Sequence, residues 1–122
     1  MSAEPKWRVV HYETEEGDCP IAEFLDGLTR KERAKVLAQI DLLEEKGPNL
    51  HRPYADLLRD RIHELRVRMS PSGYRVLYFF CHRTDIVLTH GFRKQTARVP
   101  KAQIDRAKRY RAEWIGRHHE NA

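Results

Sequence analysis

Five cationic side chains in the second half of the chain have the types and spacing that phosphate chemistry needs. Arg66 and Arg68 are two residues apart in a run that alternates like a strand, so both point from one face. Arg75 follows a short turn and begins a second strand-like run, which a hairpin would pair beside them. Arg93 and Lys94 follow a third strand-like run. Preorganised guanidinium and ammonium groups can stabilise the charge that develops on phosphorus during phosphodiester cleavage.

RNA is the substrate that requires the fewest catalytic groups at such a site, because its own 2′-hydroxyl is the nucleophile. The protein then supplies positioning, charge stabilisation and proton transfer, and we expect neither a metal nor a cofactor. No histidine, cysteine or carboxylate grouping has metal-ligand spacing. The alternative, which the residues alone leave open, is that these arginines only bind phosphate or form surface salt bridges.

Histidine is the usual proton-transfer group at neutral pH, and His90 is the best placed. It stands at the end of a strand-like run, close to Arg93, where it could orient RNA or move a proton. His63 shares a predicted face with Leu65 and Val67, which indicates a packed histidine instead.

Other residues could hold the RNA without taking part in chemistry. Tyr74 and Phe92 are interleaved with the basic residues and could stack on unpaired bases, although aromatics of a central strand also serve as core. Lys101 and Arg106 belong to a basic C-terminal helix that could grip RNA or an acidic partner, or could simply face solvent.

The charge of the 122-residue chain is unevenly distributed. Residues 1–56 hold 8 Lys and Arg against 12 Asp and Glu, a balance of −4, whereas residues 57–122 hold 15 against 6, a balance of +9. The basic half therefore predicts a surface for an anionic partner. Charge alone does not choose between DNA, RNA, the ribosome and an acidic protein.

The composition predicts one domain, residues 1–122, in the cytoplasm and without a membrane segment. The residues from Met1 to Trp7 are polar and unlike a signal peptide, and the longest apolar run, Val76 to Cys81, is too short to cross a bilayer. Cys19 and Cys81 are far apart, and we expect free thiols.

The first half of the chain predicts a strand and a helical hairpin. Trp7 to Tyr12 is strand-like; Asp18 is a plausible N-cap for a helix through Leu28; and Thr29 with Glu32 forms a capping-box pattern that opens a second helix. Gly47-Pro48 ends that helix, and we expect a loop over residues 49–60.

The second half predicts a hairpin, a further strand and a final helix. The expected elements are strands over 63–69, 74–81 and 85–92, a turn over 70–73, and a helix over 101–116. This order indicates an α+β fold, in which a helical hairpin packs on a mostly antiparallel sheet.

Three segments read together resemble the RelE/ParE toxin superfamily, and most closely its HigB-like branch, which includes phage-derived toxins. They are Leu65-Arg-Val-Arg68, Gly73-Tyr-Arg-Val-Leu-Tyr-Phe-Phe80 and His90-Gly-Phe-Arg-Lys94, followed by Pro100 and a basic helix. The resemblance implies a RelE-like fold with a curved sheet. It also implies the toxin of a type II toxin–antitoxin pair, a metal-independent, ribosome-dependent mRNA endonuclease that inhibits translation and is held inactive by an antitoxin, usually a helix-turn-helix, HigA-like protein.

The resemblance also implies roles for individual residues. Arg66, Arg68, Arg75 and Arg93 match positions that contact the scissile phosphate and stabilise the transition state in RelE-like members. Such members often add a tyrosine shortly after the last strand, whereas residues 95–99 read Gln-Thr-Ala-Arg-Val. The general base would then be His90, Lys94 or Glu64.

Two other functions compete with mRNA cleavage. A ParE-like protein would inhibit DNA gyrase and cut nothing, but chains of that type typically lack the cluster of basic strand residues. A non-catalytic RNA-binding or phage regulatory module would use the same arginines only to hold phosphate.

Overall fold

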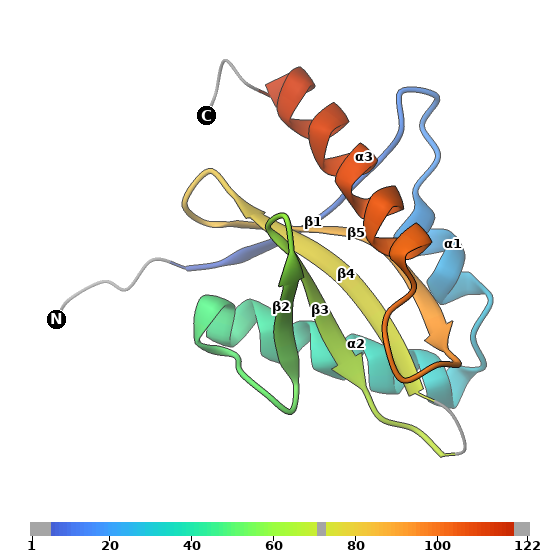
Figure 1. The fold of residues 1–122 in the computed structure, drawn as a ribbon. Coiled ribbons are helices and arrows are strands. Elements are labelled where there is room, and N and C mark those ends of the chain that lie inside the picture. Colours follow the sequence, from blue (N-terminus) through green and yellow to red (C-terminus); the bar gives the residue numbers. More distant parts are fainter. Residues whose placement is uncertain (1–5, 71–72, 119–122) are drawn as a thin grey trace, which may run out of the picture.

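The strands of this protein form one sheet that separates two N-terminal helices from a C-terminal helix (Figure 1). The computed structural model describes residues 6–70 and 73–118. Its elements, in chain order, are β1 (Arg8–His11), α1 (Pro20–Asp26), α2 (Arg30–Lys46), a short 3-10 helix η1 (Gly47–Asn49), β2 (Ala55–Arg59), β3 (Ile62–Val67), β4 (Gly73–Cys81), β5 (Asp85–Lys94) and α3 (Lys101–His118).

The sheet has five strands in the order β1-β5-β4-β3-β2. β1 pairs parallel to β5, and every other pairing is antiparallel. The predicted α+β fold with a mostly antiparallel sheet is therefore confirmed.

The two faces of the sheet carry separate cores. Tyr74, Val76 and Tyr78 of β4 point to the face that α1 and α2 cover, whereas Leu77 and Phe79 point to the face of α3. β4 is apolar on both sides because it lies at the centre of the sheet with helices over each face (Figure 1).

The start of α2 follows the prediction, and the start of α1 differs from it. The Thr29 hydroxyl accepts from the Glu32 backbone N–H, and a Glu32 carboxylate oxygen accepts from the Thr29 backbone N–H, so the capping box is confirmed. The N-cap of α1 is Cys19 instead of Asp18, because Pro20 occupies the first helical position and Asp18 belongs to the preceding turn. α1 also ends at Asp26, two residues earlier than expected.

The expectation of a loop over residues 49–60 is wrong. This span contains β2, whose sequence Ala-Asp-Leu-Leu-Arg has few residues with high strand propensity. β2 is an edge strand that forms by pairing with β3, and Asp60 and Arg61 take positive φ angles in the tight turn between them.

Two irregularities in strand pairing decide which side chains face α3. In β5, Leu77 pairs with His90 but Tyr78 pairs with Leu88, so Thr89 is an extra residue and the alternation reverses beyond it. In β2, Leu57 pairs with His63, but Arg59 pairs with Ile62, so Leu58 is an extra residue and the alternation of β2 also reverses beyond it. Residues after each bulge therefore point to the face opposite to the one that simple alternation assigns.

The remaining elements agree closely with expectation. β5 extends through Arg93 and Lys94, which belong to the strand instead of following it, and α3 runs two residues past Gly116. Within residues 6–70 and 73–118, no helix has the length and apolar character needed to cross a membrane.

Gly91 is a sensitive point of this packing, because the ring of Phe24 from α1 lies against it. A Cβ added at Gly91 would lie 2.4 Å from Phe24 Cδ2. We expect Gly91→Ala to lower the free energy of unfolding by roughly 1–3 kcal/mol, measured by urea denaturation. Gly116→Ala is the matched control: its Cβ would meet no atom within 4 Å beyond its chain neighbours and the nearby backbone of its own helix, so the better helix propensity of alanine should stabilise slightly. Equal effects of the two changes would contradict this packing.

Candidate functional site

A groove lined with cations runs along the α3 face of the sheet. It consists of two adjoining hollows of about 750 and 940 Å³ that share Arg75, Lys94 and Thr96. The first reaches the β3–β4 turn, and the second extends between β2 and the segment that leads into α3. We call this the cationic groove; its basic lining residues are Arg59, Arg66, Arg68, Arg75, Arg93, Lys94, Arg98 and Lys101.

The floor of the groove is a carboxylate held between two guanidinium groups. Arg66 and Arg75 are direct cross-strand partners on β3 and β4, so the predicted hairpin is confirmed and its register selects Arg66 as the partner of Arg75. Glu64, with 4% of its side chain exposed, accepts from Arg75 Nε at 2.8 Å on one oxygen and from Arg66 Nε at 3.1 Å on the other. These bonds fix both guanidinium groups in orientation.

Further charges continue this arrangement toward the edge of the sheet. Arg66 Nη2 lies 3.6 Å from Asp56 Oδ2, and Asp56 also accepts from Arg52 Nη2 at 2.8 Å. The hydrogen bond from Arg52 is the main cause that lowers the pKa of Asp56 below its ordinary value. Burial is the main cause that lowers the pKa of Arg75, and the Glu64 carboxylate opposes that effect.

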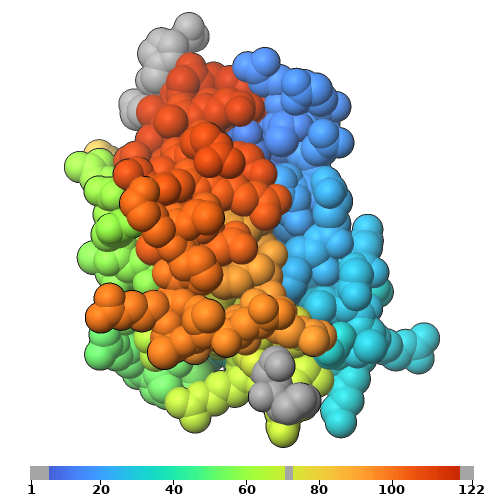
Figure 2. Space-filling view, turned by 45° about the vertical axis from the view of Figure 1, so that its right-hand side comes forward, coloured from blue at the N-terminus to red at the C-terminus, as the bar shows by residue number. Residues whose placement is uncertain are grey.

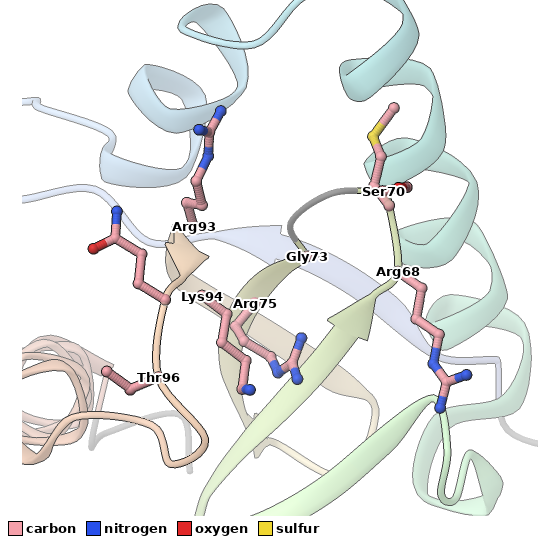
Figure 3. Close-up of a pocket in the computed structure, with 9 residues that line it drawn as sticks. Arg68, Ser70, Gly73, Arg75, Arg93, Lys94 and Thr96 are labelled. Atoms are coloured by element: carbon pink, nitrogen blue, oxygen red, sulfur yellow. The ribbon is translucent and has the colours of Figure 1, made fainter.

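Lys94 and Arg68 differ from Arg66 and Arg75 because neither forms an ion pair within the described ranges 6–70 and 73–118. Lys94 extends to the same side as Arg75, and Arg68 lies apart from this pair at the end of β3 (Figure 3). The bulge at Thr89 turns Lys94 to this face. Lys94 therefore brings an uncompensated charge next to the oriented guanidinium of Arg75.

Arg93 reaches only the edge of the groove, because its side chain points toward the helices (Figure 3). Its Nη2 donates to the Tyr74 hydroxyl at 3.2 Å and lies 3.9 Å from Glu32 Oε2. The Tyr74 hydroxyl donates to the same carboxylate, and this bond is the main cause that lowers the pKa of Glu32. The structure thus separates Arg93 from Arg66, Arg75 and Lys94, with which the sequence grouped it.

The structure does not bring His90 to the groove. The ring is 1% exposed beneath α3, with Nε2 hydrogen-bonded to Gln103 Oε1 at 2.8 Å and Nδ1 to Thr89 Oγ1 at 3.1 Å. Burial lowers the pKa of His90 to about 4, so the ring is neutral at neutral pH. His63 is half-buried and stacks on Tyr78, as expected of a packed histidine.

The residues predicted to hold RNA take different positions. Tyr74 is buried against Phe24, so its ring does not face solvent, and Phe92 is partly buried against His90. Lys101 lines the groove, where its Nζ lies 2.9 Å from Asp105 Oδ2. Arg106 donates to the Tyr110 hydroxyl within α3 at 2.9 Å and does not line the groove.

The groove also contains residues that the sequence analysis did not single out, Arg59 and Arg98. Arg59 lies in the span that was expected to be a loop; its one signal is its place directly before a two-residue turn. Arg98 had no signal beyond its charge. Within the described part of the chain, no three His, Cys, Asp or Glu side chains gather in a way that could hold a metal ion.

The comparisons with known proteins place residues 23–112 in a recognised family. The model of that family, described as "Phage derived protein Gp49-like (DUF891)", matches this span, which includes the second half of α1, all of α2, all strands except β1, and most of α3. No curated protein matches the chain.

The buried, neutral His90 predicts a dependence of stability on pH. Above pH 6.5 the ring is neutral in both states, but between 6.5 and about 4 the unfolded chain binds a proton that the folded chain excludes. Acidification from pH 7 to 4.5 should therefore cost on the order of 2–3 kcal/mol through His90. We measure the free energy of unfolding by urea denaturation and compare each protein with its own value at pH 7. On acidification to pH 4.5, the free energy of unfolding of His90→Asn should fall by about 2–3 kcal/mol less than that of the unaltered protein. Exposed His11→Asn is the control, and a drop in His90→Asn as large as in the unaltered protein would refute a neutral His90.

Proposed function

Because this chain belongs to the phage-derived Gp49-like family, a toxin family related to RelE/ParE and HigB-like, we propose that it is a toxin that cuts mRNA on the ribosome. The observation that carries the proposal is the cationic groove, in which Glu64 orients Arg66 and Arg75 beside the unpaired Lys94. A gyrase inhibitor would have no need of such a phosphate site.

In the proposed reaction the 2′-hydroxyl oxygen attacks the adjacent phosphorus. A bond from O2′ to phosphorus forms as the bond from phosphorus to the 5′ oxygen breaks, which leaves a 2′,3′-cyclic phosphate and a free 5′-hydroxyl. The 2′-hydroxyl passes its proton to a water molecule during attack, and the departing 5′ oxygen takes a proton from water. The reaction requires no metal in this scheme, because the nucleophile belongs to the substrate.

Arg75 and Lys94 are the groups that we assign to the scissile phosphate. Charge on the non-bridging oxygens grows in the pentavalent transition state, and the two cations point to one place, so they stabilise it more than the ground state. Arg68 would hold the strand nearby. No histidine or tyrosine is among the described residues that line the groove, so we assign its role to charge stabilisation and assign substrate geometry to the ribosome.

We further propose two partners, both of which follow from the family relationship. One is the translating ribosome with its mRNA. The other is a cognate antitoxin of the helix-turn-helix, HigA-like type, which would keep the toxin inactive in the cell.

The proposal is tested by inducing the protein in growing bacteria and mapping new mRNA 5′ ends. We expect cuts within translated messages, and we expect Arg75→Ala/Lys94→Ala to reduce them at least 100-fold, since the two changes together remove transition-state charge stabilisation of about 3 kcal/mol or more. Lys31→Ala/Lys46→Ala is the matched control, because it removes two charges from α2 on the opposite face. Circular dichroism should show that both variants are folded.

The other outcomes are equally informative. Growth arrest with intact mRNA would replace this proposal with gyrase or another protein target. Undiminished cutting by the folded Arg75→Ala/Lys94→Ala variant would show that the site lies elsewhere. Absence of both arrest and cutting would favour a non-catalytic binding module.

Arg93 should matter less than Arg75 for the cutting, because its side chain points to Tyr74 and Glu32. We expect Arg93→Ala to reduce the number of new 5′ ends less than tenfold in the same mapping, against a much larger loss for Arg75→Ala. An equal loss in the two single variants, both folded by circular dichroism, would contradict the division of roles that we draw from the side-chain directions.

A further inference from the structure

We propose that the cationic groove contains a second phosphate seat, formed by Arg59, Arg98 and Lys101, so that it binds a single strand of RNA through at least two phosphates. The inference rests on the proposed function for the class of ligand. It adds where the strand runs: from the β3–β4 turn, past Arg75 and Lys94, to the space between β2 and α3.

The first argument is the bulge in β2, which turns Arg59 into the groove. Simple alternation after Leu57, which pairs with His63 on the α2 face, would put Arg59 on that same face. The register shift pairs Arg59 with Ile62 instead, and Ile62 belongs to the core under α3. A bulge that re-aims one cation toward a groove is typical of a functional position.

The second argument is distance along the sheet. Arg59 pairs with Ile62, and Arg75 pairs with Arg66, so the two arginines lie four β3 residues apart along the strand direction. At about 3.3 Å per residue this is roughly 13 Å, before the spacing between strands is added. The two arginines therefore start from different parts of the groove floor, and in the proposal Arg59 serves a different phosphate from Arg75.

The opposite wall supplies the other two cations of this seat. Arg98 lies in the segment between β5 and α3, and Lys101 is the first residue of α3. In the space-filling view, the orange surface of α3 and of the segment before it lies beside the green surface of β2 and β3 (Figure 2). The seat is therefore assembled from two segments that are far apart in the sequence.

One carboxylate already interacts with this seat. Asp105 accepts from Lys101 Nζ at 2.9 Å, and the hydrogen bond from Lys101 is the main cause that lowers the pKa of Asp105; the charge of Arg59 acts in the same direction. Asp105 thus neutralises part of the positive charge that would attract a phosphate. Removing its charge should strengthen binding of a polyanion, whereas removing Arg59 or Lys101 should weaken it.

Apolar side chains share the second hollow with the cations, which suits a nucleotide chain. Leu58, Val99 and Ile104 line this hollow, so the sugars and bases of a strand would meet apolar surface while its phosphates meet charge. Contacts of this kind hold the backbone and favour no particular base.

The test is binding of a fluorescein-labelled 2′-O-methyl RNA hexanucleotide, which cannot be cut, followed by fluorescence anisotropy at 50–200 mM KCl. We expect Arg59→Ala/Lys101→Ala to weaken hexanucleotide binding about tenfold, and to reduce the slope of log affinity against log salt by about 0.7 for the lost phosphate. An unlabelled dinucleotide, with one phosphodiester, should compete equally well in both proteins to within about twofold, because the seat at Arg75 and Lys94 remains.

Two variants make the test directional. Asp105→Asn should raise hexanucleotide affinity severalfold. Lys31→Ala/Lys46→Ala removes as much charge as Arg59→Ala/Lys101→Ala, but from the opposite face of the sheet, and should change the affinity less than twofold. Unchanged or weaker binding by Asp105→Asn would count against the seat.

Three results would overturn the inference. They are absence of hexanucleotide binding at 50 mM KCl, equal loss of binding in the α2 control, and equally tight binding of an aspartate hexapeptide, which would indicate an acidic protein ligand. The cutting assay is independent of these results. If the unaltered protein cuts no mRNA but still binds the hexanucleotide more tightly than the dinucleotide, the proposed reaction is refuted and the second seat remains.

Discussion

Arg66 and Arg75 are cross-strand neighbours, and two guanidinium groups this close repel each other unless an anion lies between them. Glu64 is that anion, and it is itself buried, so each of the three charges depends on the other two. Removing the carboxylate would leave two paired strands with opposed like charges. Removing either arginine would leave a buried carboxylate with one partner. The orientation of Arg75 toward the groove is a consequence of this balance.

The two bulges distribute the remaining cations. Each inserts one residue, and each reverses the alternation of the strand beyond it. The bulge in β5 sends Lys94 to the α3 face and Arg93 to the α2 face, and the bulge in β2 adds Arg59 to the α3 face. Thr89 compensates for the broken pairing, since its hydroxyl donates to the Leu77 carbonyl at 3.1 Å.

Regular patterns could be predicted from the sequence, and departures from them could not. Alternation along β3 and the short turn after it correctly placed Arg75 on the strand next to Arg66 and Arg68, and the capping box located the start of α2. A bulge residue cannot be recognised from the alternation of polar and apolar residues. The sequence therefore did not predict that Lys94 and His90 face α3 while Arg93 faces α2. β2 was missed for another reason: its propensity is low, and its partner, not its composition, makes it a strand.

The separation of charge along the chain becomes a separation in space, because the sheet stands between α1 and α2 on one face and α3 on the other. The half with a balance of −4 supplies β1, α1 and α2, whereas the half with a balance of +9 supplies β3 to β5 and α3. A body charged in this way has a dipole, and the field of a distant polyanion exerts a torque on it. Encounters with such a partner begin with the groove already turned toward it, so the association rate falls steeply as added salt shortens the range of the field.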